Sequence, residues 1–255
     1  MKSFFRKNQL QLIWSSVLLL VFLFLISLLI DILQKNSQVV QLHERVEKET
    51  KFVFQGNLLD SLLKENDYAM ITIGHRGCSS CEQLMISEPT RIEAIAKLFF
   101  DRSFHKNNQL LAMALYHTAN PQSFIIDKNY EIIGMVTGYE DWEQKVWNII
   151  EGQNPGDQIS GSLPDYPHNL EMITHSLHAT IHLLNNEPDK AYQAIHRSRA
   201  RGRYPYSSYL LYVLHSDLGI SDSVEFYRNE SHRLIDDGIK TIIFEGILSS
   251  LKNVQ

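Results

Sequence analysis

The stretch Gly77-Cys78-Ser79-Ser80-Cys81 contains both cysteines of the 255-residue chain, three positions apart. An apolar run at 68–74 leads into it, and a polar, helix-compatible stretch follows from Glu82. This order predicts a strand, a tight turn, the cysteine pair and then a helix. A Cys-x-x-Cys pair in that setting is more often catalytic than structural.

The composition excludes several classes of protein. The formal net charge is −5, and no global basic bias points to nucleic acid as a partner. Two cysteines are too few for a disulfide-stapled scaffold, and too few for a four-ligand zinc site unless histidines contribute. We therefore expect neither a bound metal nor a cofactor, and the length allows one large domain or two small ones.

The N-terminus has the pattern of a membrane anchor. Residues 1–9 carry three basic side chains and no acidic one, and residues 10–30 carry no charge. A helix of that length is about 30 Å long, enough to cross a bilayer core. The alternative, a cleaved signal peptide, has a shorter apolar region followed by small residues, which 31–35 do not supply.

A signal-anchor at 10–30 predicts a single-pass protein of the cell membrane. The basic residues favour a cytoplasmic position for 1–9 and place the bulk of the chain outside the cytoplasm. That compartment is oxidising or enzyme-controlled, so a cysteine pair there can cycle between dithiol and disulfide. Residues 31–51 are expected to form a helical stalk, as a spacer or as a pairing helix.

Residues 52–152 have an alternating pattern of strands and helices, which predicts an α/β domain. The expected strands cover 68–73, 98–101, 122–127 and 131–136. The expected helices begin near Asn57 or Asp60, cover 81–97 and 107–116, and close the domain around 142–150. Pro89 should kink or break the helix at 81–97.

This arrangement resembles the thioredoxin superfamily. Asn120-Pro121 lies 43 residues after Cys78, close to the family spacing of its cis-proline, and Gly138 matches the glycine after the last strand. The resemblance implies a central mixed sheet flanked by helices. It also implies a redox-active disulfide between Cys78 and Cys81, in which Cys78 attacks and Cys81 resolves, with Asn120 and Pro121 contacting the substrate.

The residues around the cysteine pair are expected to favour the thiolate form of Cys78. Cys78 stands at the predicted N-terminus of a helix, whose dipole favours the thiolate. His75 and Arg76 add positive charge nearby, in the same direction. The alternatives are a static disulfide or inert thiols on a fold kept as a binding platform, and a metal site that would need His75.

Several departures from the family pattern point to a dedicated protein partner. Gly77 stands where the family usually has tryptophan, and Ser79-Ser80 separates the cysteines instead of Gly-Pro. The family's buried acid falls near Thr72, which cannot ionise, and Asn120 precedes the proline. The approach at 73–76 resembles small thioredoxin-like accessory proteins of bacterial peptide export.

The C-terminal third is expected to be helical. Turn-forming residues make 153–168 a linker, and 169–255 contains helix pairs that begin about 36 residues apart, near the tetratricopeptide spacing. A generic helical bundle is the alternative, and either would bind a protein ligand rather than catalyse. Two further patterns have two interpretations each. One helical stripe is either the polar flank of a helix or a metal site, and it contains Glu171, His175, His178 and His182. A basic patch is either a solvated helix end or a docking site for an anionic lipid surface or an acidic partner, and it contains Arg197, Arg199, Arg201 and Arg203.

These observations predict a membrane-tethered, extracytoplasmic thiol–disulfide oxidoreductase that uses Cys78 and Cys81 on a protein dithiol or disulfide. The alternative is a non-catalytic thioredoxin-like accessory or scaffold protein for an export or membrane complex. In that case the α/β domain and the helices only hold a partner.

Overall fold

The structure is a computed structural model that describes residues 22–30, 51–87, 92, 95–116, 120–153, 170–201, 205–217, 219 and 221–236. The chain divides into two units, 1–47 and 48–255. In the first unit, residues 22–30 are helical and their side chains are exposed. The rest of the anchor expected at 10–30, nearly all of the stalk and the linker lie outside the described residues. Within the described ranges, no helix is both long enough and apolar enough to span a bilayer.

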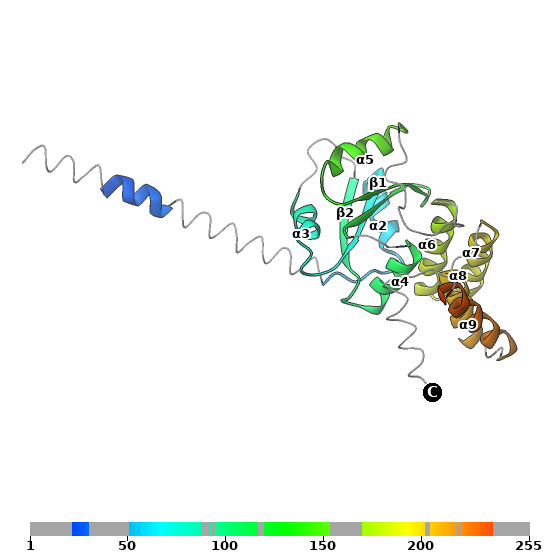
Figure 1. Ribbon diagram of the computed structural model, residues 1–255. Helices are drawn as coiled ribbons and strands as arrows, with labels where there is room; N and C mark the ends of the chain where they lie inside the picture. The colour runs from blue at the N-terminus through cyan, green and yellow to red at the C-terminus, as the bar shows by residue number, and fades with distance from the viewer. Residues whose placement is uncertain are drawn as a thin grey trace, which may run out of the picture. The chain divides into compact units, whose positions relative to one another are not determined.

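The second unit begins as an α/β layer and continues as helices (Figure 1). The α/β elements are α2 (Leu58–Glu65), β1 (Tyr68–Gly74), α3 (Ser79–Ile86), β2 (Ile95–Asp101), α4 (Lys106–Ala114), β3 (Gln122–Asp127), β4 (Ile132–Thr137) and α5 (Trp142–Ile150). The further helices are α6 (Leu170–Leu184), α7 (Pro188–Arg201), α8 (Pro205–Asp217) and α9 (Ser221–Asp236).

The four strands form one mixed sheet in the order β2-β1-β3-β4. Strand β1 runs parallel to β2 and antiparallel to β3, and β3 pairs antiparallel with β4. The register places Gly74 opposite Asp101 and Ile73 opposite Gln122. The loops after β1 and β2, the start of β3 and the end of β4 therefore lie at one end of the sheet. The mixed sheet with flanking helices, expected from the sequence, is confirmed.

Each face of the sheet packs against its own set of helices, because alternate residues of a strand point to opposite faces. On one face, Met70 and Ile125 pack with Leu84 of α3 and Val146 of α5. The other face, with Ile71 and its neighbours, is covered by α2, α4 and α6. Figure 1 shows α3 apart from α4 and α6.

The helix expected at 81–97 was predicted too long, and the strand expected at 98–101 too short. Helix α3 ends at Ile86, and Ile95 already pairs with Tyr68 in the sheet. The Lys97 ammonium from β2 donates to the carbonyl groups of Leu84 and Ser87, and so satisfies acceptors that the end of α3 leaves open. Apolar residues at 92, 95 and 96 fit a helix or a strand equally well, and the sheet uses them as a strand.

The C-terminal helices form pairs, with α6 against α7 and α8 against α9. A tetratricopeptide assignment stays a prediction, and residues 237–255 of the expected helical region lie outside the described residues. One hydrophobic core contains Phe124 of the sheet, Leu111 of α4, Leu177 of α6 and Leu211 of α8. The division into domains at 52–152 and 169–255 also stays a prediction, but these two parts share that core.

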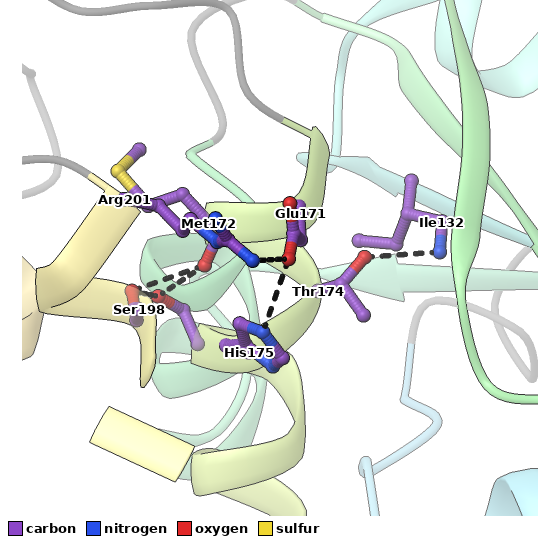
Figure 2. A network of polar contacts seen from close by, with 8 residues as sticks. Ile132, Glu171, Met172, Thr174, His175, Ser198 and Arg201 are labelled. Atoms are coloured by element: carbon purple, nitrogen blue, oxygen red, sulfur yellow. Dashed lines mark hydrogen bonds and ion pairs between the residues drawn. The ribbon is translucent and has the colours of Figure 1, made fainter. Parts of the chain in front are cut away.

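Polar contacts also join α6 to its neighbours, as Figure 2 shows. The Ile132 amide of β4 donates to Thr174 Oγ1 at 3.1 Å. On the α7 side, the Ser198 hydroxyl donates to the Met172 carbonyl at 3.0 Å, and Arg201 pairs with Glu171. Helix α6 therefore lies between the sheet and α7, with hydrogen bonds in both directions.

Candidate redox site

Cys78 and Cys81 form a disulfide at the start of α3, directly after β1. Cys78 is the N-cap residue of α3 in an extended conformation, and its sulfur accepts the Cys81 amide hydrogen bond at 3.2 Å. An amide that would otherwise be unsatisfied at a helix N-terminus therefore points at the Cys78 sulfur. Cys78 is at the place where the helix dipole favours negative charge, as the sequence predicted.

The two cysteines differ in exposure. Cys78 is partly exposed, whereas Cys81 has an exposed fraction of 0%. A thiolate from another molecule can therefore approach Cys78 but not Cys81. This asymmetry fits the roles that the family resemblance implies, attack at Cys78 and resolution by Cys81.

Gly74 allows Cys81 to lie close to the sheet. A Cβ atom on Gly74 would stand 2.7 Å from Cys81 Sγ and 2.9 Å from two atoms of the Phe99 ring. Both distances are shorter than non-bonded heavy atoms tolerate, so the disulfide packs into space that only glycine leaves open. Sequence reasoning placed Gly74 at the end of a strand and in the approach at 73–76, and it missed this contact.

Asp101 fixes the loop before the cysteines. Its side chain is 4% exposed and lies at the end of β2, opposite Gly74. One carboxylate oxygen accepts the Arg76 amide at 3.1 Å, and the other accepts the Ser103 amide at 2.8 Å and the Ser103 hydroxyl. Sequence reasoning missed this residue, although an acid ending the apolar run at 98–100 was a visible signal.

The expected substrate-contact residues lie at the same end of the sheet. The Asn120–Pro121 peptide bond is cis, Asn120 is exposed, and Pro121 is buried directly before β3. The Gly138 amide donates to the Pro121 carbonyl at 2.9 Å, which joins this segment to the end of β4. Their contact with a substrate stays a prediction.

The residues expected to tune the pair lie in the loop between β1 and α3. Arg76 is exposed and His75 partly so, and the His75 carbonyl accepts the Cys78 amide at 3.3 Å. Thr72, where the family pattern has an acid, is 1% exposed and hydrogen-bonds to Ser123 Oγ at 2.8 Å. The position of the family's acid is therefore occupied by a hydrogen-bonded pair of neutral hydroxyl groups. The carboxylate that bonds to the loop before the cysteines is instead that of Asp101, at the end of β2.

The histidines of α6 have other partners. His178 donates from Nε2 to the Tyr130 carbonyl at 2.8 Å, and His182 contacts Glu187 at 2.6 Å. Burial lowers the pKa values of His175 and His178, because it disfavours the charged imidazole. Among the residues that the structure describes, no three His, Cys, Asp or Glu side chains are grouped to hold a metal ion.

In the arginine-rich stretch, some side chains form ion pairs and others are exposed to solvent. Arg199 pairs with Glu230 of α9 at 3.0 Å, and Arg201 pairs with Glu171 of α6. Arg197 is exposed, and Arg203 lies outside the described residues. At least two of these arginines therefore hold helices together.

Two comparisons with known proteins found no match for this chain. No protein-family model matches it, and no curated protein matches it significantly. The functional interpretation therefore rests on the disulfide, its place at the start of a helix after β1, and the thioredoxin-like α/β arrangement around it.

Proposed function

We propose that this chain is a thiol–disulfide oxidoreductase of the thioredoxin superfamily that acts on a protein partner. The observation that carries the proposal is the difference between the two sulfurs of one disulfide. Cys78 is accessible at a helix N-terminus, and Cys81 is buried against Gly74. A structural disulfide gains nothing from such a difference, whereas an exchange reaction needs one sulfur to be reached and the other to be protected.

The reaction proceeds in two balanced steps. A partner thiolate attacks Cys78 Sγ, forms a mixed disulfide, and releases Cys81 as a thiolate. A second partner thiolate then attacks the partner sulfur of that mixed disulfide and releases Cys78. The partner loses two electrons and becomes a disulfide, and the pair gains two electrons and becomes a dithiol. The same steps in reverse reduce a partner disulfide.

We further propose that residues 10–30 tether the chain to the cell membrane, with the cysteine pair outside the cytoplasm. The support for this is the uncharged stretch and the three basic residues before it. Helix α6 packs on the face of the sheet away from α3, and α7 to α9 continue from it, so a protein ligand could bind these helices without covering Cys78.

The test compares single-cysteine variants in a trapping reaction. Cys81→Ser should accumulate a mixed disulfide at Cys78 when oxidised glutathione or a cysteine peptide disulfide is added, because no resolving thiol remains. Cys78→Ser, the matched control, should react at least about tenfold more slowly, because its remaining thiol is buried. Mass spectrometry of the intact chain reads the adduct. Equal reaction of the two variants, or of neither, would refute the assignment.

The alternative function is a non-catalytic accessory or scaffold protein, and the share of the core contributed by α6, α7 and α8 favours it. A variant with both cysteines replaced by serine distinguishes the two in the cell of origin. A scaffold should work as well without the sulfurs, whereas an oxidoreductase should lose its function. A quantitative western blot must show equal amounts of the variant and the natural protein.

A further inference from the structure

The loops that follow β1 and β2 form one continuous surface beside Cys78. The Arg102 amide donates to the Gly74 carbonyl at 3.1 Å, and the Arg76 amide donates to the Asp101 carboxylate at 3.1 Å. Each loop is therefore hydrogen-bonded to the end of the other strand. Neighbouring strands lie about 4.8 Å apart, so charges on the two loops act on the same approaching molecule.

This surface is basic. Three cationic residues, Arg76, Arg102 and Lys106, occupy the two loops and the first turn of α4, and we call them the basic rim. Arg76 and Lys106 are exposed, and neither forms an ion pair with another residue in the described part of the chain. Phe104, in the same loop as Arg102, is 45% exposed.

Among the described residues, Asp101 offsets the charge of Arg102 in part, but it leaves the exposed charges of Arg76 and Lys106. Asp101 is buried, and its carboxylate accepts three hydrogen bonds from Arg76 and Ser103. Glu82, one turn into α3, is partly exposed and lies beyond the cysteines. The solvent-facing charge of the two loops is therefore positive.

The opposite side of the same sheet end is acidic. Gly138 follows β4 and is joined to Pro121 by its amide, and the next residues include exposed Glu140 and Asp141. In the strand order β2-β1-β3-β4, the basic rim lies on the β2 side and these acids lie on the β4 side. Cys78, which follows β1, lies between the two.

We propose that the protein partner of this site carries acidic side chains close to its reacting cysteine, and that they dock on the basic rim. The inference rests on the proposed oxidoreductase function and specifies its substrate class. The physiological Debye length is about 8 Å, so only charges near the partner cysteine contribute strongly. Complementary charges at that range raise the rate of association and align the partner sulfur with Cys78.

The test uses three synthetic dithiol peptides of equal length, whose two cysteines are flanked by glutamate, glutamine or lysine. Each peptide reduces the oxidised full-length chain, and acid quenching followed by chromatography gives the rate. Flanking charges also change the reactivity of the peptide thiols. Each rate is therefore divided by the rate of the same peptide with the uncharged bis(2-hydroxyethyl) disulfide.

The normalised glutamate-to-lysine rate ratio should be about tenfold at low salt and should approach one near 0.5 M salt, because salt screens the rim. The double variant Arg76→Glu with Lys106→Glu should abolish or invert this ratio. The ratio within one variant cancels any change in the intrinsic reactivity of Cys78. The matched control, Lys64→Glu with Arg197→Glu, makes the same charge change at exposed positions of α2 and α7 and should keep the natural ratio.

The outcomes separate this inference from the function on which it rests. Equal normalised rates for the three peptides, or a ratio that the rim variant leaves unchanged, would overturn the acidic partner and leave the oxidoreductase intact. If no peptide reduces the disulfide through Cys78, the proposed function fails, and the inference fails with it.

Discussion

The replacement Gly74→Ala tests the contact between the sheet and the buried sulfur. The new Cβ atom would stand 2.7 Å from Cys81 Sγ, about 1 Å inside an ordinary carbon–sulfur contact. Gly74 is not among the residues with positive φ, so alanine fits its backbone and the effect comes from the contact alone. Forcing a methyl group into a packed core costs about 1–3 kcal/mol.

The cost should depend on the redox state. In the disulfide, the Cys81 sulfur is bonded to Cys78 and cannot turn away from the new methyl group, whereas in the dithiol it can rotate about Cα–Cβ. The variant should therefore destabilise the oxidised form more than the reduced form. A difference of about 1.4 kcal/mol would make the reduction potential about 30 mV less negative.

The assay is urea unfolding of both redox forms, together with the potential measured in glutathione buffers. Gly152→Ala is the matched control, because Gly152 has a φ of 68° with open space around it. Its cost, about 1–2 kcal/mol of backbone strain, should be the same in both redox states. In a Cys81→Ala background, Gly74→Ala should lose the part of its cost that is due to sulfur and keep the part due to Phe99. An equal cost in oxidised and reduced chains would refute the reasoning.

Two further predictions concern the helices. Burial lowers the pKa of His178 against the opposing effect of its hydrogen bond to the Tyr130 carbonyl, so the unfolded chain takes up the proton first as the pH falls. Stability should therefore be full above about pH 6.5 and decrease below it. The unfolding free energy of the His178→Gln variant, measured by urea titration, should decrease less over that pH range. An unchanged dependence of the unfolding free energy on pH would contradict the assignment. Glu230→Gln should cost about 1–3 kcal/mol of unfolding free energy, because Arg199 and Ser208 both bond to that carboxylate, while the exposed control Glu225→Gln should cost at most about 0.5 kcal/mol.

The sequence allowed most of the sheet to be predicted, because the strands are short apolar runs between turn residues. The strand at 122–127 was predicted with its observed bounds, and the cysteine pair was placed correctly between a strand and a helix. The predicted end of α3 was wrong. The last carbonyl groups of the helix accept hydrogen bonds from Lys97, which belongs to strand β2. Local periodicity carries no information about such a contact.

The parts of the site that the sequence did not predict depend on register. Asp101 and Gly74 are 27 positions apart, and only the parallel pairing of β1 with β2 places them opposite each other. The same holds for the space that Gly74 leaves for Cys81, since a glycine at a strand end can also mark a bulge or a tight bend. The residue types near the cysteines are visible in the sequence, but the hydrogen bonds between the loops after β1 and β2 are not.

The hydrogen bond between Ile132 and Thr174 has a consequence for biosynthesis. The nascent chain emerges from the ribosome N-terminus first, so the cysteine pair is exposed long before α6 has been synthesised. The pair lies within one helical turn and can be oxidised at that early stage. The face of the sheet opposite the pair, by contrast, is covered only by α2 and α4 until residue 184 has followed. A chain that stops before α6 would thus hold both sulfurs but expose the part of that face which α6 covers, and this exposed apolar surface favours aggregation.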